Sequence, residues 1–257
     1  MRPYIIGVFY FEVNKMIEEF NKYVSNYDMN NENIKLKYNH SIRVMNLSEK
    51  YAKLLEFSDY DIKLAKLIGL LHDFGRFEQL KVYDSFCDHK TIDHADYSVE
   101  QLFNKGLIKN FWSNENDYEL IKFAIKYHNK LDLPNINNER ILMHARLIRD
   151  TDKLDIIYLL GYLGELDKKG ISEKLTIEIY ESIMNRMCID YKYVKNANDE
   201  IACNFAYAFD INNNVCLEEF KNNLKYYYER VNEYNTFDEV YKEINNYINE
   251  RIDKNVR

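Results

Sequence analysis

The chain has 257 residues and a formal net charge of −7, and it is 46% hydrophobic and 30% charged. This composition is typical of a soluble globular protein with one large or two small domains, and it excludes a strongly basic protein that binds nucleic acid in general. Only 7 glycines and 2 prolines are present, which leaves little material for tight turns. We therefore expect long helices.

The cysteines and the N-terminal apolar run carry no sign of export or membrane insertion. Cys87, Cys188, Cys203 and Cys216 lack the Cys-x-x-Cys spacing of a zinc knuckle, and a disulfide framework is not expected at this size. The apolar run 4–11 is too short to span a membrane and has no credible cleavage site. We expect it to form a short buried segment, with a disordered extension as the alternative, in a cytoplasmic protein with reduced thiols.

Helical periodicity dominates the rest of the chain and predicts an all-α fold. The polar and aromatic stretch 79–91 is expected to form a loop over a site, and 191–214 is ambiguous. The periodic segments predict helices at about 14–27, 34–57, 59–73, 93–105, 116–130, 138–163, 172–188, 217–233 and 237–253.

Four helices each carry an ionisable residue where the helical period assigns a core position. These residues are His40, the His72-Asp73 pair, His128 and Asp152. A lone histidine on an apolar face is usually a satisfied core residue, but burying a His-Asp pair among leucines costs several kcal/mol without compensation. Convergence on one metal site explains all four, because helical bundles build such sites from inward side chains. Imidazole and carboxylate ligands suit Mn, Fe, Co, Ni or Zn.

The order of these residues resembles the HD superfamily of metal-dependent phosphohydrolases. The family pattern of His, His-Asp and a distant Asp is matched by His40, His72-Asp73 and Asp152. Asp152 is the middle aspartate of an Arg-Asp-Thr-Asp-Lys-Leu-Asp stretch, which is similar to the DADKLD signature of the family, and the sequence after His72 resembles its HDIGR form. The resemblance covers roughly 34–160.

The resemblance also implies a second metal position. His94 and His128 stand where dinuclear members of the family place additional ligands, and Asp73 could then bridge two ions. One or two divalent ions are therefore expected, drawn from Mn, Fe, Co, Ni, Zn or Mg. His89 is interpreted as a solvated loop residue, with a general-acid role as the alternative, and His144 shows no relation to the site.

Cations near these ligands are candidates for binding a phosphate. Lys153 follows a ligand directly, Arg76 lies three residues after Asp73, and Arg43 lies one turn after the first histidine. Arginine can bind phosphate through two parallel hydrogen bonds. We expect Asp73, Lys153 and Arg76 to act in catalysis, and Arg76, Lys153, Arg43 and Asn129 to contact substrate. The alternative for the cations is pairing with nearby acids on exposed helix faces.

The resemblance implies an HD-domain helical bundle with additional C-terminal helices. We expect an N-terminal segment at 1–33, the HD core at 34–163 and a helical cap at 164–257, forming one structural domain. The implied function is hydrolysis of a phosphomonoester or phosphodiester of a nucleotide-like small molecule. A di-iron oxygenase on the same scaffold and a non-catalytic regulatory module are the alternatives. No membrane partner is expected, and the oligomeric state stays open, a homodimer included.

Overall fold

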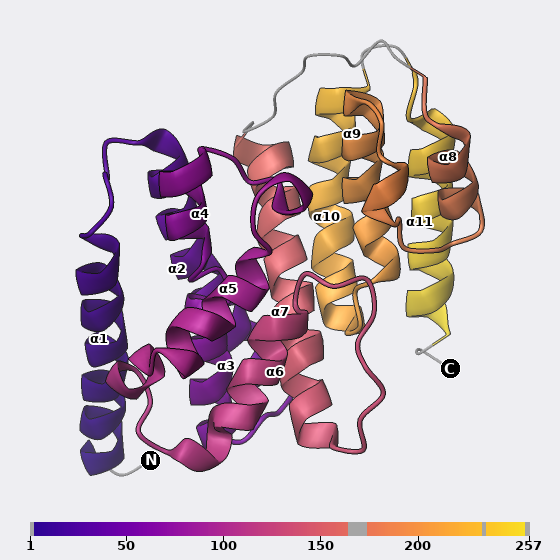
Figure 1. Ribbon diagram of the computed structural model, residues 1–257. Helices are drawn as coiled ribbons and strands as arrows, with labels where there is room; N and C mark the ends of the chain where they lie inside the picture. The colour runs from indigo at the N-terminus through magenta and orange to yellow at the C-terminus, as the bar shows by residue number, and fades with distance from the viewer. Residues whose placement is uncertain (1–2, 164–173, 233–234, 255–257) are drawn as a thin grey trace. The chain divides into compact units, whose positions relative to one another are not determined.

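The fold is known from a computed structural model that describes residues 3–163, 174–232 and 235–254, with the backbone alone for 3–13. All secondary structure within these ranges is helical, which confirms the all-α prediction (Figure 1). No helix in the described part of the chain combines the length and the apolar character that a membrane span requires.

Contacts divide the chain into two compact units. The first unit contains Met1–Lys130 and Pro134–Ile148, and the second contains Leu131–Leu133 and Arg149–Arg257. Helix α7 (Glu139–Tyr158) contributes to both units. The boundary between the two units, between Ile148 and Arg149, thus lies inside the segment 34–163 that we expected to form the core. The predicted segment boundaries after residues 33 and 163 stay predictions.

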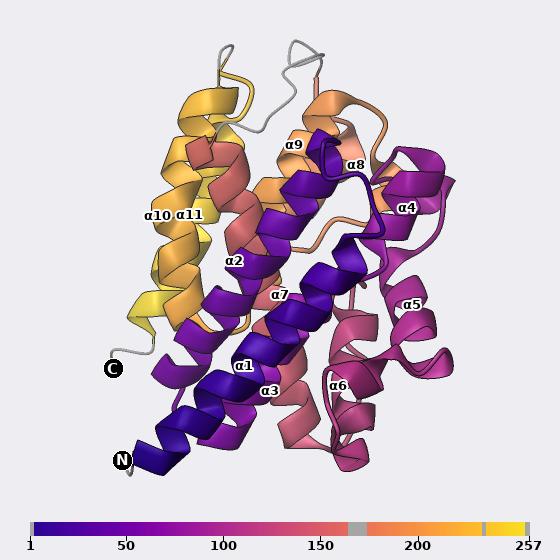
Figure 2. The same ribbon diagram turned by 90° about the vertical axis from the view of Figure 1, so that its left-hand side faces the viewer.

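The first unit is built around the pair α2 and α3, which pack along each other, while α5 and α3 both pack on α6. Helix α1 lies alongside α2 (Figure 2), and Tyr23 of α1 stacks on Phe74 with a ring-centroid distance of 3.7 Å. Besides the start of α7, the α-helices described in this unit are α1 (Pro3–Val24), α2 (Glu32–Leu54), α3 (Asp59–Leu71), α4 (Arg76–Tyr83), α5 (His94–Val99) and α6 (Tyr118–Tyr127).

Side-chain caps fix the starts of α2, α3 and α5, three of the helices that carry predicted ligands. Asn31 accepts hydrogen bonds from two backbone amides at the start of α2, and Ser58 accepts one at the start of α3. Asp93 caps α5 by accepting from the amides of Ala95 and Asp96 at 3.0 and 3.1 Å. Such caps satisfy the unpaired N–H groups of the first turn. The starting residue of each of these three helices is therefore set by contacts within its own first turn.

Two segments differ from the sequence prediction. The expected loop 79–91 is wrong in its first part, because α4 occupies Arg76–Tyr83 and buries Phe77, Gln79 and Leu80. Because α4 is short and most of its residues are polar, its sequence shows no clear helical period of apolar residues. Helix α1 begins at Pro3 rather than near 14, and the burial of 4–11 lies outside the described side chains.

The second unit has its own core. Phe205 packs against Tyr227 and stacks on Phe237, with ring-centroid distances of 5.0 and 5.6 Å. The ambiguous segment 191–214 contains α9, and the first residues of the predicted helix 172–188 lie outside the described ranges. The α-helices described in this unit are the end of α7, α8 (Ile177–Met184), α9 (Ala197–Ala206), α10 (Asn214–Val231) and α11 (Asp238–Asp253).

The buried His144 pairs with the half-buried Asp61 and so joins the first half of α7 to α3, with Nε2 and Oδ1 3.1 Å apart. Burial lowers the pKa of His144 below its ordinary value, although Asp61 acts against this shift. The unfolded chain therefore binds more protons than the folded protein below about pH 6.5, and this part of the stability is lost as the pH falls. The pKa of Asp61 is also lowered, because hydrogen bonds outweigh its burial, so its contribution is lost only nearer pH 4.

We therefore expect the free energy of unfolding to fall between pH 7.5 and pH 5.5, and to fall less in His144→Gln. Urea denaturation of both proteins at the two pH values, with chelator present throughout, measures the difference. Equal losses in the two proteins would show that His144 has no part in the pH dependence.

Candidate metal centre

Five of the predicted ligands meet in the first unit. His40 comes from the middle of α2, His72 and Asp73 from the turn after α3, His94 from the first position of α5, and His128 directly follows α6. All five side chains are buried, with no more than 2% of each residue exposed. Since α3 ends at Leu71, the His-Asp pair sits on a turn, which lets the two adjacent side chains reach the same site.

His40, His72 and Asp73 form a first group of donors. The two Nε2 atoms are 3.2 Å apart, and Asp73 Oδ2 lies 3.4 Å from the first and 3.6 Å from the second. Ligand bonds of about 2.0–2.2 Å place neighbouring ligand atoms about 3 Å apart, so these separations fit a shared ion. Nδ1 of His72 lies 2.8 Å from the carbonyl oxygen of Gly69, which must accept from it. Nε2 is thereby left as the ligand atom.

His94 and His128 form a second group with the other oxygen of the same carboxylate. Their Nε2 atoms are 3.0 Å apart, and Asp73 Oδ1 lies 3.1 Å from His94 and 3.8 Å from His128. One carboxylate therefore faces both pairs of imidazoles, one oxygen to each pair. This is the arrangement that a ligand bridging two ions requires.

The second histidine pair is also oriented to present lone pairs. Nδ1 of His128 donates to the carbonyl oxygen of Ile125 at 2.7 Å, and Nδ1 of His94 faces the Asp88 carboxylate at 2.6 Å. In neutral rings both Nε2 atoms then carry lone pairs that point at each other across 3.0 Å. A cation between them removes that repulsion, and outer hydrogen bonds of this kind are usual for histidines that bind metals.

Lys37, a cation next to the shared carboxylate, was not predicted from the sequence. Lys37 Nζ lies 2.6 Å from Asp73 Oδ2, and Arg76 Nε lies 3.6 Å from Oδ1. Burial by itself raises the pKa of Asp73, but the Lys37 ammonium and the surrounding imidazoles hold it well below its usual range. Asp73 is therefore ionised. The available signal for Lys37 was its position one helical turn before His40.

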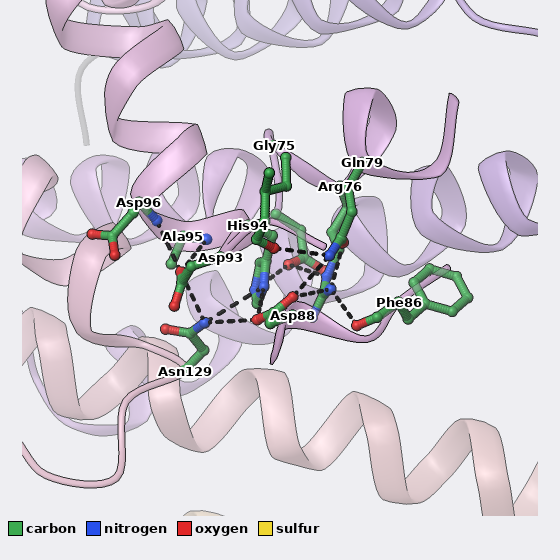
Figure 3. A network of polar contacts seen from close by, with 12 residues as sticks. Gly75, Arg76, Gln79, Phe86, Asp88, Asp93, His94, Ala95, Asp96 and Asn129 are labelled. Atoms are coloured by element: carbon green, nitrogen blue, oxygen red, sulfur yellow. Dashed lines mark hydrogen bonds and ion pairs between the residues drawn. The ribbon is translucent and has the colours of Figure 1, made fainter. Parts of the chain in front are cut away.

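Arg76 is held by the loop that follows α4 (Figure 3). Its Nη1 donates to Gln79 Oε1 at 2.6 Å, to the carbonyl oxygen of Phe86 at 2.8 Å and to Asp88 Oδ1 at 2.7 Å. Burial would raise the pKa of Asp88, but His94 and Arg76 lower it strongly. Asp88, which the sequence analysis also missed, thus connects Arg76 to His94, a histidine of the second donor group.

Asn129 lies beside this network. Its amide nitrogen donates to Asp88 at 3.1 Å and to Asp93 at 3.3 Å, and Lys130 forms an ion pair with Asp93. Its Oδ1 is buried and has no hydrogen-bond partner within the described ranges. The amide braces the residues around His94, and its predicted contact with substrate stays a prediction.

Three further predicted residues lie on α7 and α2. Asp152 is half-buried on the part of α7 that belongs to the second unit. In the same unit, Lys153 Nζ lies 2.6 Å from Asp210 Oδ2, and Arg149 Nη2 lies 2.6 Å from Oδ1. Arg43 is half-buried on α2. The metal role of Asp152 and the phosphate roles of Lys153 and Arg43 stay predictions.

The donor set suits divalent first-row ions. It combines four imidazoles with one carboxylate, and no cysteine belongs to a metal-ligating group within the described ranges. Imidazole and carboxylate together fit Mn, Fe, Co, Ni or Zn, whereas structural zinc sites usually contain thiolates. The residues present therefore fit one ion in each donor group.

Elemental analysis of protein purified without chelator should find more than one ion per chain. His94→Ala should lower this number by removing a ligand of one group, and Asp73→Ala should lower it further by removing the ligand that both groups share. His89→Ala is the control, because this exposed histidine lies outside the donor groups. A content near one ion that His94→Ala leaves unchanged would contradict the second position.

Comparison with known proteins agrees with this geometry. The family model named HD domain matches residues 38–157. The chain is 32% identical over 140 residues to a protein of Staphylococcus aureus (strain NCTC 8325 / PS 47) named "Bis(5'-nucleosyl)-tetraphosphatase, symmetrical", a match that covers 51% of this chain and 70% of that protein. No solved structure matches the chain significantly. The chain therefore belongs to the HD-domain family of phosphohydrolases.

Proposed function

We propose that this chain is a metal-dependent hydrolase of nucleotide phosphates. The observation that carries the proposal is the Asp73 carboxylate placed between two pairs of imidazoles, with Lys37 and Arg76 beside it. Membership of the HD family supports hydrolysis, and the name of the staphylococcal relative supports a nucleotide substrate. That name also adds the phosphoanhydride bonds of dinucleoside polyphosphates to the esters expected from sequence.

His40 and His72 would hold one ion and His94 and His128 the other, with Asp73 contributing an oxygen to each. When bound, divalent ions lower the pKa of a coordinated water and neutralise charge on phosphoryl oxygens. Asp152 is proposed as a further ligand from its place in the family motif.

The cations beside Asp73 favour an anionic substrate. Lys37 has only 13% of its side chain exposed and pairs directly with the shared carboxylate. Arg76 is equally buried, and its Nε has no hydrogen-bond partner among the described residues. Two partly buried cations offset the charge of a phosphate but have no evident use in oxidising a C–H bond. They favour a hydrolase over the di-iron oxygenase, and the two donor groups that share Asp73 favour an enzyme over a regulatory module.

The proposal is tested by measuring phosphate or nucleotide release from diadenosine tetraphosphate, nucleoside triphosphates, cyclic nucleotides and sugar phosphates. Each substrate is combined with Mn, Co, Ni, Fe or Mg in turn. We expect release from at least one nucleotide, and its loss on treatment with chelator. Turnover that requires dioxygen and iron, without release from any nucleotide, would contradict the proposal.

Asp73→Ala should lower kcat/KM on that substrate by about a thousandfold or more, because metal ions supply several kcal/mol of charge stabilisation in the transition state. Steady-state kinetics measures the loss, and His144→Gln serves as the control for changing a buried ionisable residue outside the cluster. Activity in Asp73→Ala comparable to the wild type would rule out the proposed centre as the catalytic site.

A further inference from the structure

An exposed aromatic ring lies close to the shared carboxylate. Phe86, in the loop after α4, is 37% exposed. Lys37 Nζ lies 5.4 Å from the centroid of its ring and 2.6 Å from Asp73 Oδ2, so the centroid is at most about 8 Å from that oxygen. The guanidinium carbon of Arg76 lies 5.9 Å from the same centroid. Two cations therefore lie within cation–π range of this ring.

A chain of hydrogen bonds connects the backbone of Phe86 to His94, one of the proposed metal ligands. The carbonyl oxygen of Phe86 accepts from Arg76 Nη1, which also donates to Asp88, and Asp88 in turn pairs with His94 (Figure 3). Single exposed aromatic residues are common on protein surfaces and need no explanation by themselves. Phe86 differs in two ways. Its backbone is bonded to Arg76, which pairs with the Asp88 carboxylate that faces His94. The two cations near its ring also lie close to Asp73.

We propose that Phe86 binds the nucleobase of the substrate by stacking. A nucleotide carries a planar aromatic base one ribose away from a chain of anionic phosphates. The chain offers a matching order of groups, with the Phe86 ring, then Lys37 and Arg76, then the donor groups around Asp73. Stacking tolerates every base, since each has a π-face, so we expect weak discrimination among bases. This inference rests on the proposed function and assigns its base-binding residue.

Binding of two phosphate ligands to the full chain separates stacking from phosphate contacts. Isothermal titration calorimetry at a fixed free Mn²⁺ concentration measures the Kd of ADP, which has a base, and of pyrophosphate, which has none. Wild type should bind ADP more tightly than pyrophosphate. Phe86→Ala should weaken ADP by roughly 5- to 150-fold, the range measured for loss of one stacked base, and should leave pyrophosphate unchanged.

Two further variants complete the design. Phe86→Trp should restore ADP binding, because it returns an aromatic face. Tyr83→Ala should leave both ligands unchanged, since Tyr83 is a comparably exposed aromatic residue at the end of α4, 47% exposed. Equal affinity of wild type for the two ligands, or an equal weakening of both by Phe86→Ala, would overturn the proposal. Product release by wild type is scored separately, so ADP binding through Phe86 without turnover of any nucleotide refutes the proposed function and leaves the base site standing.

Discussion

The burial of the Asp73 carboxylate is the constraint on which the rest of the site depends. An ionised carboxylate that is 2% exposed costs free energy unless charges and hydrogen bonds compensate it. Lys37 supplies one compensating charge, and the surrounding imidazoles supply ligands that can hold others. The end of α3, the cap of α5 and the end of α6 bring those groups to the two oxygens. The helical bundle of the first unit thus serves to place donors around one side chain.

The outer hydrogen bonds explain how the donors keep their orientation. Backbone carbonyls one turn before His72 and His128 fix the protonated nitrogen of each ring, and Asp88 does the same for His94. Asp88 also pairs with Arg76, which holds the loop bearing Phe86. Loop, cation and ligand are therefore one connected network.

The sequence was sufficient to predict the ligands that share the cluster. The helical period places His40 and His128 on apolar faces, and the family resemblance alone adds His94, so all three could be named before their distances were known. Lys37 and Asp88 could not, because their partners lie far along the chain or beyond a polar loop, and a charged residue there resembles any solvated one. The same polar composition concealed α4. The metal role of Asp152 stays a prediction.

The central claim is that Asp73 lies between two ions. Anomalous diffraction from crystals grown with Mn²⁺ tests it most directly, because the ions are located independently of activity. We expect two anomalous peaks about 3.5–4 Å apart, one against each oxygen of Asp73. The first should lie beside His40 and His72 and the second beside His94 and His128. A single peak that leaves one oxygen of Asp73 without an ion, or no peak at this carboxylate, would contradict it.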